Sequence, residues 1–425
     1  MKPLASMYLK PLAMSGALAA GMLLLSACSG GGGNAASPLT PQSQAVSATH
    51  PGGAAPLQTE ASSRGLEPNV RRACNPSNEP NVWSCMALIR TDVGGLGPDN
   101  SPVGYTPGDL QSAYDLPSST AGAGQTIAVV EAYDDPNAQS DFDFYRKFFK
   151  LPKCKKKCFQ KVNQNGQKSP LPSACGSCGW DVELSLDMEM VSAICPNCDV
   201  IVVEAESATT TDLGTGVDSA IKLGATVVSN SYGGGGTSGA SFYDHPGTII
   251  TASAGDDGYG VAVPAGFPTV VAVGGTTLHL SDGQRSTETV WGSSSGGEGT
   301  GSGCETSLSK PSWQTDTGCK GRTMNDVSAD ANPNTGVAIY DTYSQHGWLE
   351  VGGTSVSSPV VASIYGLAGN ASTLTAAQSL YASGASLFDV TSGADGSCSP
   401  AYLCTAETGY DGPTGNGAPI GATAF

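Results

Sequence analysis

A serine in a glycine-rich turn is the first residue of this sequence that could do chemistry. Ser355 lies within Val351–Pro359, where Gly352 and Gly353 allow a tight turn and the close approach of another chain. The apolar run Val356–Leu367 predicts that a helix begins just after the serine. A hydroxyl at that position suits a nucleophile, because the free N–H groups and the dipole of a helix N-terminus favour an oxyanion. An N-capping serine before a buried helix is the alternative, and this stretch alone does not decide between the two.

Two carboxylates form a second candidate group. Glu183 and Asp187 are four residues apart in a predicted helix over Asp181–Ile194, and this spacing puts them on one face. Most of their neighbours are apolar, so the helix is predicted to be largely buried. Two buried acids on one face must repel each other or share a proton, which perturbs their pKa values and suits proton transfer. A solvated acidic stripe is the alternative.

A third acid follows a predicted strand. Asp256 lies in Ser253–Gly258, directly after the apolar run Thr248–Ala252. It is therefore expected at the carboxyl end of a strand. An aspartate in an ordinary turn is the alternative.

A histidine is the usual base for a serine nucleophile. The chain has 4 histidines, and His346, in a polar loop shortly before Ser355, is the candidate among them. None of the four stands in the His-Gly-Thr context of subtilisin-like enzymes, so a structural role is expected for each.

The elements that would position these residues alternate along the chain. Ile127–Val130 is a continuous apolar run typical of a buried strand, and Ser140–Phe149 is amphipathic and helical. Further strands and helices follow at Val200–Val203, Asp212–Leu223, Thr226–Ser229, Thr248–Ala252, Thr269–Val273 and Gly336–Tyr340. This order predicts an α/β fold with a mostly parallel sheet and helices on both faces. Working groups in such sheets gather at the carboxyl ends of strands, and Ser355 is expected there, after the last of these strands.

With three motifs in this order, the sequence resembles the sedolisin family, the serine-carboxyl peptidases that share the subtilisin fold. Glu183-x-x-x-Asp187 is similar to the family's base and its partner acid. Ser253-Ala254-Gly255-Asp256 is similar to the oxyanion motif, and Gly353-Thr354-Ser355-x-Ser357-x-Pro359 to the nucleophile motif. The resemblance runs from about Tyr105 to the C-terminus and implies a subtilisin-like fold.

The resemblance implies a role for each of these residues. Glu183 would be the general base, oriented by Asp187 through a shared proton, and Ser355 would attack the peptide carbonyl. Asp256 would donate a hydrogen bond to the oxyanion, together with the Ser355 N–H. A carboxyl group donates only when it is protonated, so Asp256 must stay neutral while Glu183 is ionised. Activity is therefore expected to peak below neutral pH.

Two further features follow from the same resemblance. Ser231, Tyr232 and Gly233 are similar to the family's substrate-binding strand, which would pair with an extended peptide through main-chain hydrogen bonds. Glu131, just after the first strand, stands where subtilisins carry their triad aspartate and could extend the proton network. Ordering of the loop that follows Glu131 is the alternative.

The resemblance also implies one Ca²⁺ site in the C-terminal region. Its ligands would be the side chains of Asp389 and Asp411 and the carbonyls of Val390, Glu407 and Gly409. Carboxylates and carbonyls of a glycine-rich loop suit a hard cation with six or more oxygen ligands. An acidic C-terminal loop without metal is the alternative.

The composition limits the partners of the chain. It has 20 Lys+Arg against 37 Asp+Glu, which argues against nucleic acid because no basic face is available to neutralise phosphates. Only 13% of its residues are charged while 57 are glycine, so we expect a loop-rich chain with a compact apolar core. A monomer that acts on proteins or peptides is expected.

The front of the chain has the pattern of an export signal. Residues 1–27 combine Lys2 and Lys10 with an uncharged run, and Leu25-Ser26-Ala27-Cys28 resembles a bacterial lipobox in which Cys28 receives lipid. An ordinary cleaved signal is the alternative. Residues 28–70 are predicted to be a disordered tether. A short cysteine-bearing segment, 71–104, and a peptidase domain, 105–425, are expected to follow. No other stretch is apolar for long enough to span a membrane, so we expect an exported protein that is secreted or held at the cell envelope by its lipid alone.

The cysteines indicate disulfides. Of the 13 cysteines, an even number remains once Cys28 is set aside, as is typical of an exported chain. Local pairs are expected between Cys74 and Cys85, Cys154 and Cys158, Cys304 and Cys319, and Cys398 and Cys404. Cys175-x-x-Cys178 followed by Cys195-x-x-Cys198 matches the spacing of a four-thiolate zinc site, but an oxidising compartment favours disulfides.

Together these observations predict an exported serine-carboxyl endopeptidase. Two alternatives stay open, a surface protein that binds peptides on the same fold without turnover and a serine hydrolase that depends on His346. One feature departs from the family. Sedolisins are usually made with a large folded propeptide, whereas only the tether and a short cysteine pair lie between Cys28 and Tyr105.

Overall fold

The computed structural model describes residues 65–93, 101–153, 158–382 and 386–425. The predicted export signal, its lipid site at Cys28 and most of the predicted tether lie outside the described residues, as does Cys154. Within the described ranges, no helix combines the length and the apolar character needed to cross a bilayer.

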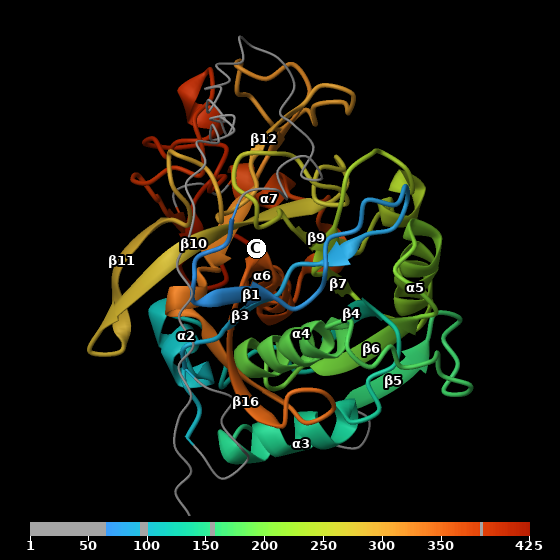
Figure 1. The fold of residues 1–425 in the computed structure, drawn as a ribbon. Helices are drawn as coiled ribbons and strands as arrows, with labels where there is room; N and C mark the ends of the chain where they lie inside the picture. The colour runs from blue at the N-terminus through green and yellow to red at the C-terminus, as the bar shows by residue number, and fades with distance from the viewer. Residues whose placement is uncertain (1–64, 94–100, 154–157, 383–385) are drawn as a thin grey trace, which may run out of the picture. The chain divides into compact units, whose positions relative to one another are not determined.

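An eight-stranded sheet forms the centre of the fold (Figure 1). Its order is β11-β10-β9-β7-β4-β6-β5, with β14 paired to β10. Every pairing is parallel except that of β10 with β11, which form an antiparallel hairpin. The strands are β4 (Thr126–Ala132), β5 (Phe159–Asn163), β6 (Asp199–Ala205), β7 (Val227–Asn230), β9 (Ile249–Ser253), β10 (Val271–Ser281), β11 (Gln284–Val290) and β14 (Val327–Asp330). The predicted fold class, with its mostly parallel sheet, is confirmed.

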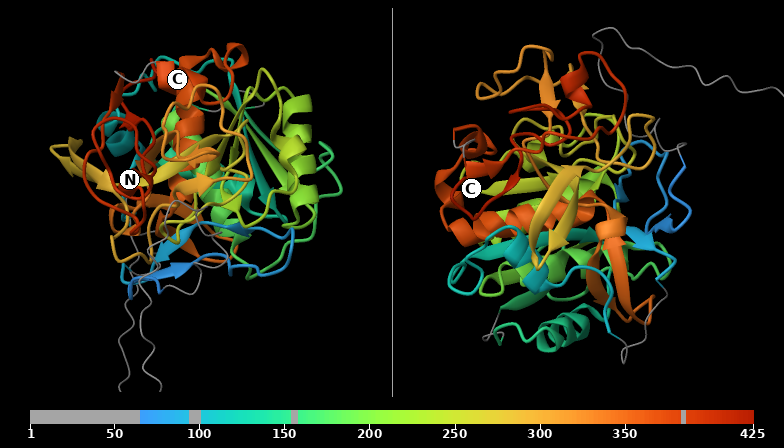
Figure 2. Two further views of the ribbon diagram at one scale, coloured as in Figure 1. Left: turned by 90° about the horizontal axis from the view of Figure 1, so that it is seen from above. Right: turned by 90° about the vertical axis from the view of Figure 1, so that its left-hand side faces the viewer.

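Helices cover both faces of this sheet (Figure 2). The helices α4 (Trp180–Ile194) and α6 (Thr354–Ala368) pack together on one face, and α5 (Thr210–Lys222) packs on the other. All of α4 is buried, because α2 (Pro107–Ala113) and α3 (Ala138–Phe148) pack against it.

The alternation of side chains along β4 decides which face each residue meets. Ile127 and Val129 belong to the core beneath α4 and α6, whereas Ala128 and Val130 belong to the core beneath α5. Because strand residues alternate between faces, Glu131 points to the same side as Ile127 and Val129, towards α4.

A second, antiparallel sheet lies next to the turn of residues 352–355, which leads into the helix of Ser355 and is called the serine turn below. Its order is β1-β3-β16-β15, formed by β1 (Val70–Arg72), β3 (Leu88–Arg90), β16 (Gly347–Gly352) and β15 (Val337–Asp341). The strand predicted at Gly336–Tyr340 therefore exists but belongs to this small sheet. The expectation that Ser355 follows a strand of the parallel sheet was wrong, because the unpredicted strand β16 intervenes and leads directly into the serine turn.

Short elements complete the described chain. Three two-stranded ladders pair β2 (Ser84–Cys85) with β8 (Tyr232–Gly233), β12 (Gly303–Glu305) with β13 (Arg322–Met324), and β17 (Leu387–Phe388) with β18 (Ala418–Pro419). The short helices are η1 (Ala240–Tyr243), η2 (Pro333–Thr335), η3 (Ala371–Thr373), α7 (Gln378–Ala382) and η5 (Ala401–Leu403).

Disulfides join five pairs of the described cysteines. Three are pairs that the sequence predicts, namely Cys74–Cys85, Cys304–Cys319 and Cys398–Cys404. The zinc alternative was wrong, because its four sulfurs form the disulfides Cys175–Cys178 and Cys195–Cys198.

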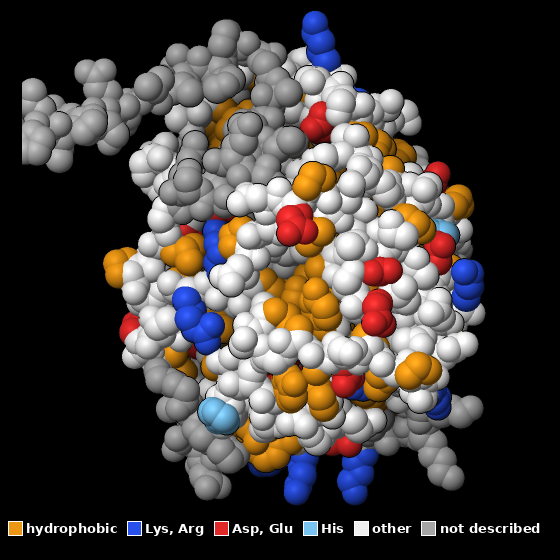
Figure 3. Space-filling model, turned by 45° about the vertical axis from the view of Figure 1, so that its right-hand side comes forward, with side chains coloured by type: hydrophobic (Ala, Val, Ile, Leu, Met, Phe, Trp, Pro, Cys, Tyr) orange, Lys and Arg blue, Asp and Glu red, His pale blue; other side chains and the backbone are white. Residues whose placement is uncertain are grey.

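The surface in Figure 3 shows how charge is distributed on one face. Hydrophobic side chains gather near the centre, acidic side chains stand among polar surface around them, and Lys and Arg side chains lie mostly towards the edges (Figure 3). This face therefore offers apolar contact and negative charge.

Candidate active site

Ser355 is the second residue of α6 and begins a fully buried helix. Gly353 is the N-cap residue, so the N-capping alternative for the serine was wrong. The φ of Gly353 is 97°, a conformation that favours glycine. Pro359 has no N–H to offer the Ser355 carbonyl four residues earlier, and that carbonyl accepts a hydrogen bond from Ser231 Oγ at 3.4 Å. In return, Ser355 Oγ donates to the Ser231 carbonyl at 3.4 Å. The serine is thus held at the helix N-terminus.

Glu183 lies on α4 and reaches the same place. It is 0% exposed. Its Oε2 accepts the N–H groups of Met86 at 3.0 Å and Ala87 at 2.8 Å. Burial raises the pKa of Glu183 well above its usual value, and the nearby charge of Asp187 adds to this. The nearby Ser355 hydroxyl and the hydrogen bond from the Ala87 N–H act in the opposite direction and lower the pKa of Glu183. The serine hydroxyl therefore lies near enough to the carboxyl group to affect its protonation, while Glu183 Oε1 has no hydrogen-bond partner among the described residues.

Asp187 and Glu131 form a second, deeper pair of acids. Burial raises the pKa of Asp187 to about 8, while hydrogen bonds from Ser231 and Glu131 lower it. Ser231 Oγ donates to Asp187 Oδ2 at 2.9 Å. Glu131 has its pKa raised well above the usual value by burial and by the charges of Asp187 and Glu183, and neither of its oxygens receives an N–H or hydroxyl donor from the described residues. The raised pKa favours the protonated form of Glu131, beside Asp187.

The burial of these acids excludes one of the alternatives. Glu131, Glu183 and Asp187 are each 0% exposed, so the solvated acidic stripe was wrong. The spacing of four residues does place Glu183 and Asp187 on one face of α4, directed at Ser355 and at Ser231 respectively. The position of Glu131 on the α4 side of the sheet brings it into the same network.

Asp256 follows β9 and contacts the serine turn from the other side. Its Oδ1 accepts the N–H and the hydroxyl of Thr354, both at 2.8 Å. Its Oδ2 has no partner among the described residues and lies 2.7 Å from the position that a Cβ on Gly353 would occupy. Burial raises the pKa of Asp256 to about 7. A neutral Asp256 would therefore carry its proton on Oδ2, beside the N-terminus of α6.

The predicted substrate strand is paired with a part of the same chain. In β8, Tyr232 faces Cys85 and Gly233 faces Ser84 in an antiparallel ladder, and the Met86 N–H donates to the Ser231 carbonyl at 3.2 Å. Sequence reasoning missed the residues that fill this place, Met86 and Ala87. A cysteine pair just before them was the one signal in the sequence that the segment is held in a fixed position.

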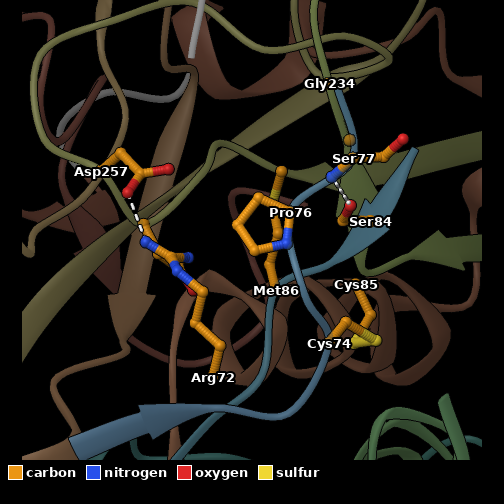
Figure 4. A pocket seen from close by; sticks show the side chains of 11 residues that line it. Arg72, Cys74, Pro76, Ser77, Ser84, Cys85, Met86, Gly234 and Asp257 are labelled. Carbon is orange, nitrogen blue, oxygen red and sulfur yellow. Dashed lines mark hydrogen bonds and ion pairs between the residues drawn. A yellow bond between two sulfur atoms is a disulfide. The ribbon is translucent and has the colours of Figure 1, made fainter. Parts of the chain in front are cut away.

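A cavity lies beside this segment (Figure 4). Met86 and Pro76 stand between the ion pair of Arg72 with Asp257 and the Cys74–Cys85 disulfide (Figure 4). Residues of β8 and the Asp256 loop complete its wall. The cavity is therefore bounded by the N-terminal segment on one side and by the predicted substrate strand on the other.

None of the histidines in the described ranges reaches this site. His346 is exposed in the turn between β15 and β16. It lies at the far end of a six-residue strand, about 20 Å along the chain from the serine turn. His245 pairs with Asp218 at 3.0 Å, and His279 is exposed on β10. The hydrolase that depends on His346 is therefore excluded by geometry.

The residues predicted to bind Ca²⁺ lie around one loop. Asp389 accepts the Gly409 N–H at 3.0 Å, and Asp411 accepts the Glu407 N–H at 3.0 Å. Burial, with a smaller contribution from the charge of Asp389, raises the pKa of Asp411 to about 7. Neither acid forms an ion pair with a described Lys or Arg, and no cluster of three or more His, Cys, Asp or Glu side chains that could hold a metal gathers in the described part of the chain. The two side-chain donors are carboxyl groups whose negative charges repel each other. A bound cation would reduce this repulsion.

With this geometry in view, comparison with known proteins identifies the class. A sequence profile of the Subtilase family matches residues 164–382, just over half of the 425 residues. The chain therefore belongs to the subtilase family. The structure of Pseudomonas sedolisin, a serine-carboxyl proteinase complexed with two molecules of pseudo-iodotyrostatin, matches with a TM-score of 0.64 at 25% identity, over 76% of this chain and 96% of that one.

Relatives of known sequence include a kumamolisin and a sedolisin. Kumamolisin of Bacillus sp. (strain MN-32) is 29% identical over 362 residues, covering 76% of this chain and 63% of kumamolisin. Sedolisin of Pseudomonas sp. (strain 101) is 40% identical over 173 residues, covering 37% of this chain and 29% of that protein. The chain thus spans less than two thirds of the length of either relative. The predicted resemblance to the sedolisin family is confirmed.

Proposed function

We propose that this chain is a serine-carboxyl endopeptidase that hydrolyses peptide bonds of proteins and peptides in acid. One observation carries the proposal. A serine hydroxyl at a helix N-terminus interacts with a buried glutamate, and a further buried acid lies over the same turn, while no histidine of the described ranges is near. Membership of the subtilase family and the sedolisin relatives support it.

The mechanism assigns one step to each group. Glu183 takes the proton of Ser355 as its oxygen attacks the substrate carbonyl, and later gives that proton to the leaving amine. Asp187, held by Ser231 and by the shared proton of Glu131, fixes the charge and orientation of Glu183. The Ser355 N–H and the protonated Oδ2 of Asp256 stabilise the oxyanion. Water then releases the acyl group from Ser355.

The pKa values set the working range. Asp256 must hold its proton to donate, so activity is lost as the pH rises through its pKa of about 7. Glu183 must be ionised to accept the proton, so activity is also lost as the pH falls through the pKa of Glu183, which burial raises above its ordinary value. The pH–rate profile is therefore a bell with its maximum below neutral.

An assay of three variants tests this proposal. The native chain and the variants Ser355→Ala, Glu183→Gln and His346→Ala are incubated with an unstructured protein substrate at about pH 4 and pH 8. We expect the native chain to hydrolyse the substrate at the lower pH. The rate should fall by at least about a thousand-fold in Ser355→Ala and in Glu183→Gln, and it should be unchanged in His346→Ala. Stable turnover through pH 8, or full activity in Glu183→Gln, would contradict the mechanism. A folded native chain without turnover at either pH would favour the alternative of a peptide-binding protein.

We propose further that Asp389, Asp411 and the carbonyls of Val390, Glu407 and Gly409 hold one Ca²⁺. When bound, the cation would supply positive charge between two carboxylates and would stabilise the folded chain. We expect the melting temperature of the Ser355→Ala chain to fall in chelator and to recover with Ca²⁺. In an Asp389→Asn background the chelator should have little effect. An unchanged melting temperature in chelator would remove the metal from the proposal.

A further inference from the structure

The N-terminal segment lies in the candidate active site in the manner of a substrate. In Figure 1 the blue N-terminal strands cross in front of α6. Ser84–Cys85 forms an antiparallel ladder with β8, the strand expected to bind an extended peptide. Beyond Met86 and Ala87, β3 pairs with β16, where Leu88 faces Gly352 and Ile89 faces Val351. The Met86–Ala87 bond is therefore held from both sides directly over the serine turn.

Two groups of the site lie beside both this bond and Ser355. The Ser231 carbonyl accepts the Met86 N–H at 3.2 Å and the Ser355 hydroxyl at 3.4 Å. Glu183 accepts the Ala87 N–H at 2.8 Å and lies near enough to the Ser355 hydroxyl for that hydroxyl to lower its pKa. The Ala87 nitrogen therefore lies where the leaving nitrogen of a substrate would need to be, beside Glu183, which returns the proton to it.

The carbonyl of Met86 lies where the oxyanion is expected. A Cβ placed on Gly353 would be 2.1 Å from the Met86 carbonyl oxygen and 2.7 Å from Asp256 Oδ2. The two oxygens thus share the small space beside Gly353. Because two unprotonated oxygens would repel at close range, this arrangement suits a proton on Asp256 that is donated to the carbonyl.

The side chain of Met86 fills an apolar place beside these groups. Its Sδ accepts a hydrogen bond from Ser253 Oγ at 3.2 Å, and its Cε would lie 2.7 Å from a Cβ placed on Gly233. Met86 is 8% exposed. An unbranched, flexible side chain is well suited to such a slot, which predicts that the site prefers a long apolar residue on the acyl side of the bond it cuts.

We infer that Met86–Ala87 is the chain's own first substrate: Ser355 cleaves this bond within the same molecule, and until then the segment closes the cleft to other peptides. This inference rests on the proposed peptidase activity. Ser355 Oγ bonds to the Met86 carbonyl carbon while its proton passes to Glu183. The C–N bond then breaks, and the Ala87 nitrogen takes that proton. Water hydrolyses the ester, leaving a carboxylate on Met86 and the Ser355 hydroxyl restored.

Cleavage would separate the tether from the peptidase. The Cys74–Cys85 disulfide closes a loop that lies wholly before Met86, so it does not join the two products across the bond. After the cut, noncovalent contacts would hold the N-terminal product in place, among them the pairing of β2 with β8 and of β1 with β3 and the ion pair of Arg72 with Asp257. The new N-terminus would read Ala87-Leu88-Ile89-Arg90.

The full chain is purified and incubated at about pH 5, and intact mass and N-terminal sequencing follow the cut. We expect the Ala87 terminus to form with a first-order rate that does not depend on protein concentration, and not at all in Ser355→Ala. Met86→Ala should slow it about ten-fold or more, because the apolar slot is left unfilled. Val82→Ala truncates a side chain of the same segment away from the serine turn and should leave the rate unchanged.

Two measurements separate this inference from the proposed function. An added quenched-fluorescent peptide is offered to the same samples. If the peptide is hydrolysed while Met86 and Ala87 stay joined, the inference is wrong and the peptidase stands. If the bond is cut only between molecules, as when the native chain is added to the Ser355→Ala chain and cuts it, the inference of cleavage within one molecule is wrong. A folded chain that cuts neither the peptide nor its own bond contradicts both.

Discussion

A carboxyl group can replace the usual amide donor of an oxyanion site only while it is protonated. In Asp256 the two oxygens have different tasks, since Oδ1 accepts both hydrogen bonds from Thr354 and Oδ2 is left without a partner among the described residues. Asp256 keeps this proton in acid because burial raises its pKa to about 7. The acid range of the proposed enzyme thus depends on how well water is kept from one side chain.

Replacing this acid by its amide tests that dependence. In Asp256→Asn the amide oxygen can accept from Thr354 while the NH₂ group donates at every pH. We expect the loss of kcat/KM above pH 7 to disappear or to move upward by at least one pH unit, with acid activity kept within about ten-fold. The pH profile of kcat/KM is the measurement. Asp257→Asn, one residue along, is the control, and alkaline limbs that coincide in native and Asp256→Asn chains would contradict this role.

At the scale of elements, the site is assembled where two sheets meet. α4 brings Glu183 and Asp187 from the helical layer, and β4 adds Glu131 from the parallel sheet. β16 of the antiparallel sheet leads into the serine turn and also pairs with β3, the strand that follows the Met86–Ala87 bond. The strand that leads into the serine turn therefore also pairs with the segment that covers the serine.

The Cys74–Cys85 disulfide is predicted to strengthen this cover. It closes a loop of sequence separation 11 and ties β2 to the turn before it. Removing it with Cys74→Ser and Cys85→Ser should weaken the pairing of β2 with β8 by an amount of up to about 3 kcal/mol. We expect faster hydrolysis of an added peptide in the first minutes, before self-cleavage is complete. The matched variant Cys398→Ser/Cys404→Ser removes a disulfide far along the chain, and equal rates in both variants would contradict a covering role.

At the scale of the whole molecule, the chain buries an unusual number of acids. Burial raises the pKa of several to between about 7 and about 8, namely Asp135, Asp187, Glu204, Asp256 and Asp341. Each is close to its ordinary pKa when the chain unfolds. The folded chain therefore binds more protons than the unfolded chain between pH 4 and pH 8, and its stability must fall as the pH rises through that window.

Thermal unfolding measures this directly. We expect the melting temperature of the Ser355→Ala chain, used so that self-cleavage does not intervene, to drop by roughly 5 °C or more between pH 5 and pH 8. Asp135→Asn removes one of the titrating groups outside the candidate site and should reduce the drop. A melting temperature that rises over this range would mean that the buried acids ionise on folding, against the direction given above.

Local pattern was enough to predict much of this protein. Apolar runs predicted most strands of the parallel sheet, and the spacing of Glu183 and Asp187 on an apolar helix predicted a buried acid pair, because period and burial are properties of a single element. Neighbouring cysteines were likewise predicted to pair, as those at 74 and 85 do. The glycines before Ser355 predicted a turn into a helix, and Gly353 does end that turn as the N-cap of α6.

Only the tertiary structure decided which distant groups meet. The strand β16 mixes Glu350 with apolar residues and ends in glycines, so no local signal marked it, and its pairing with β3 is a contact across more than 250 residues. Nothing in Met86 or Ala87 alone indicates that their N–H groups bind Glu183. A hydrogen bond between distant segments depends on where the whole chain places two backbones. Sequence period records only which face of an element is buried, and not what is buried against it.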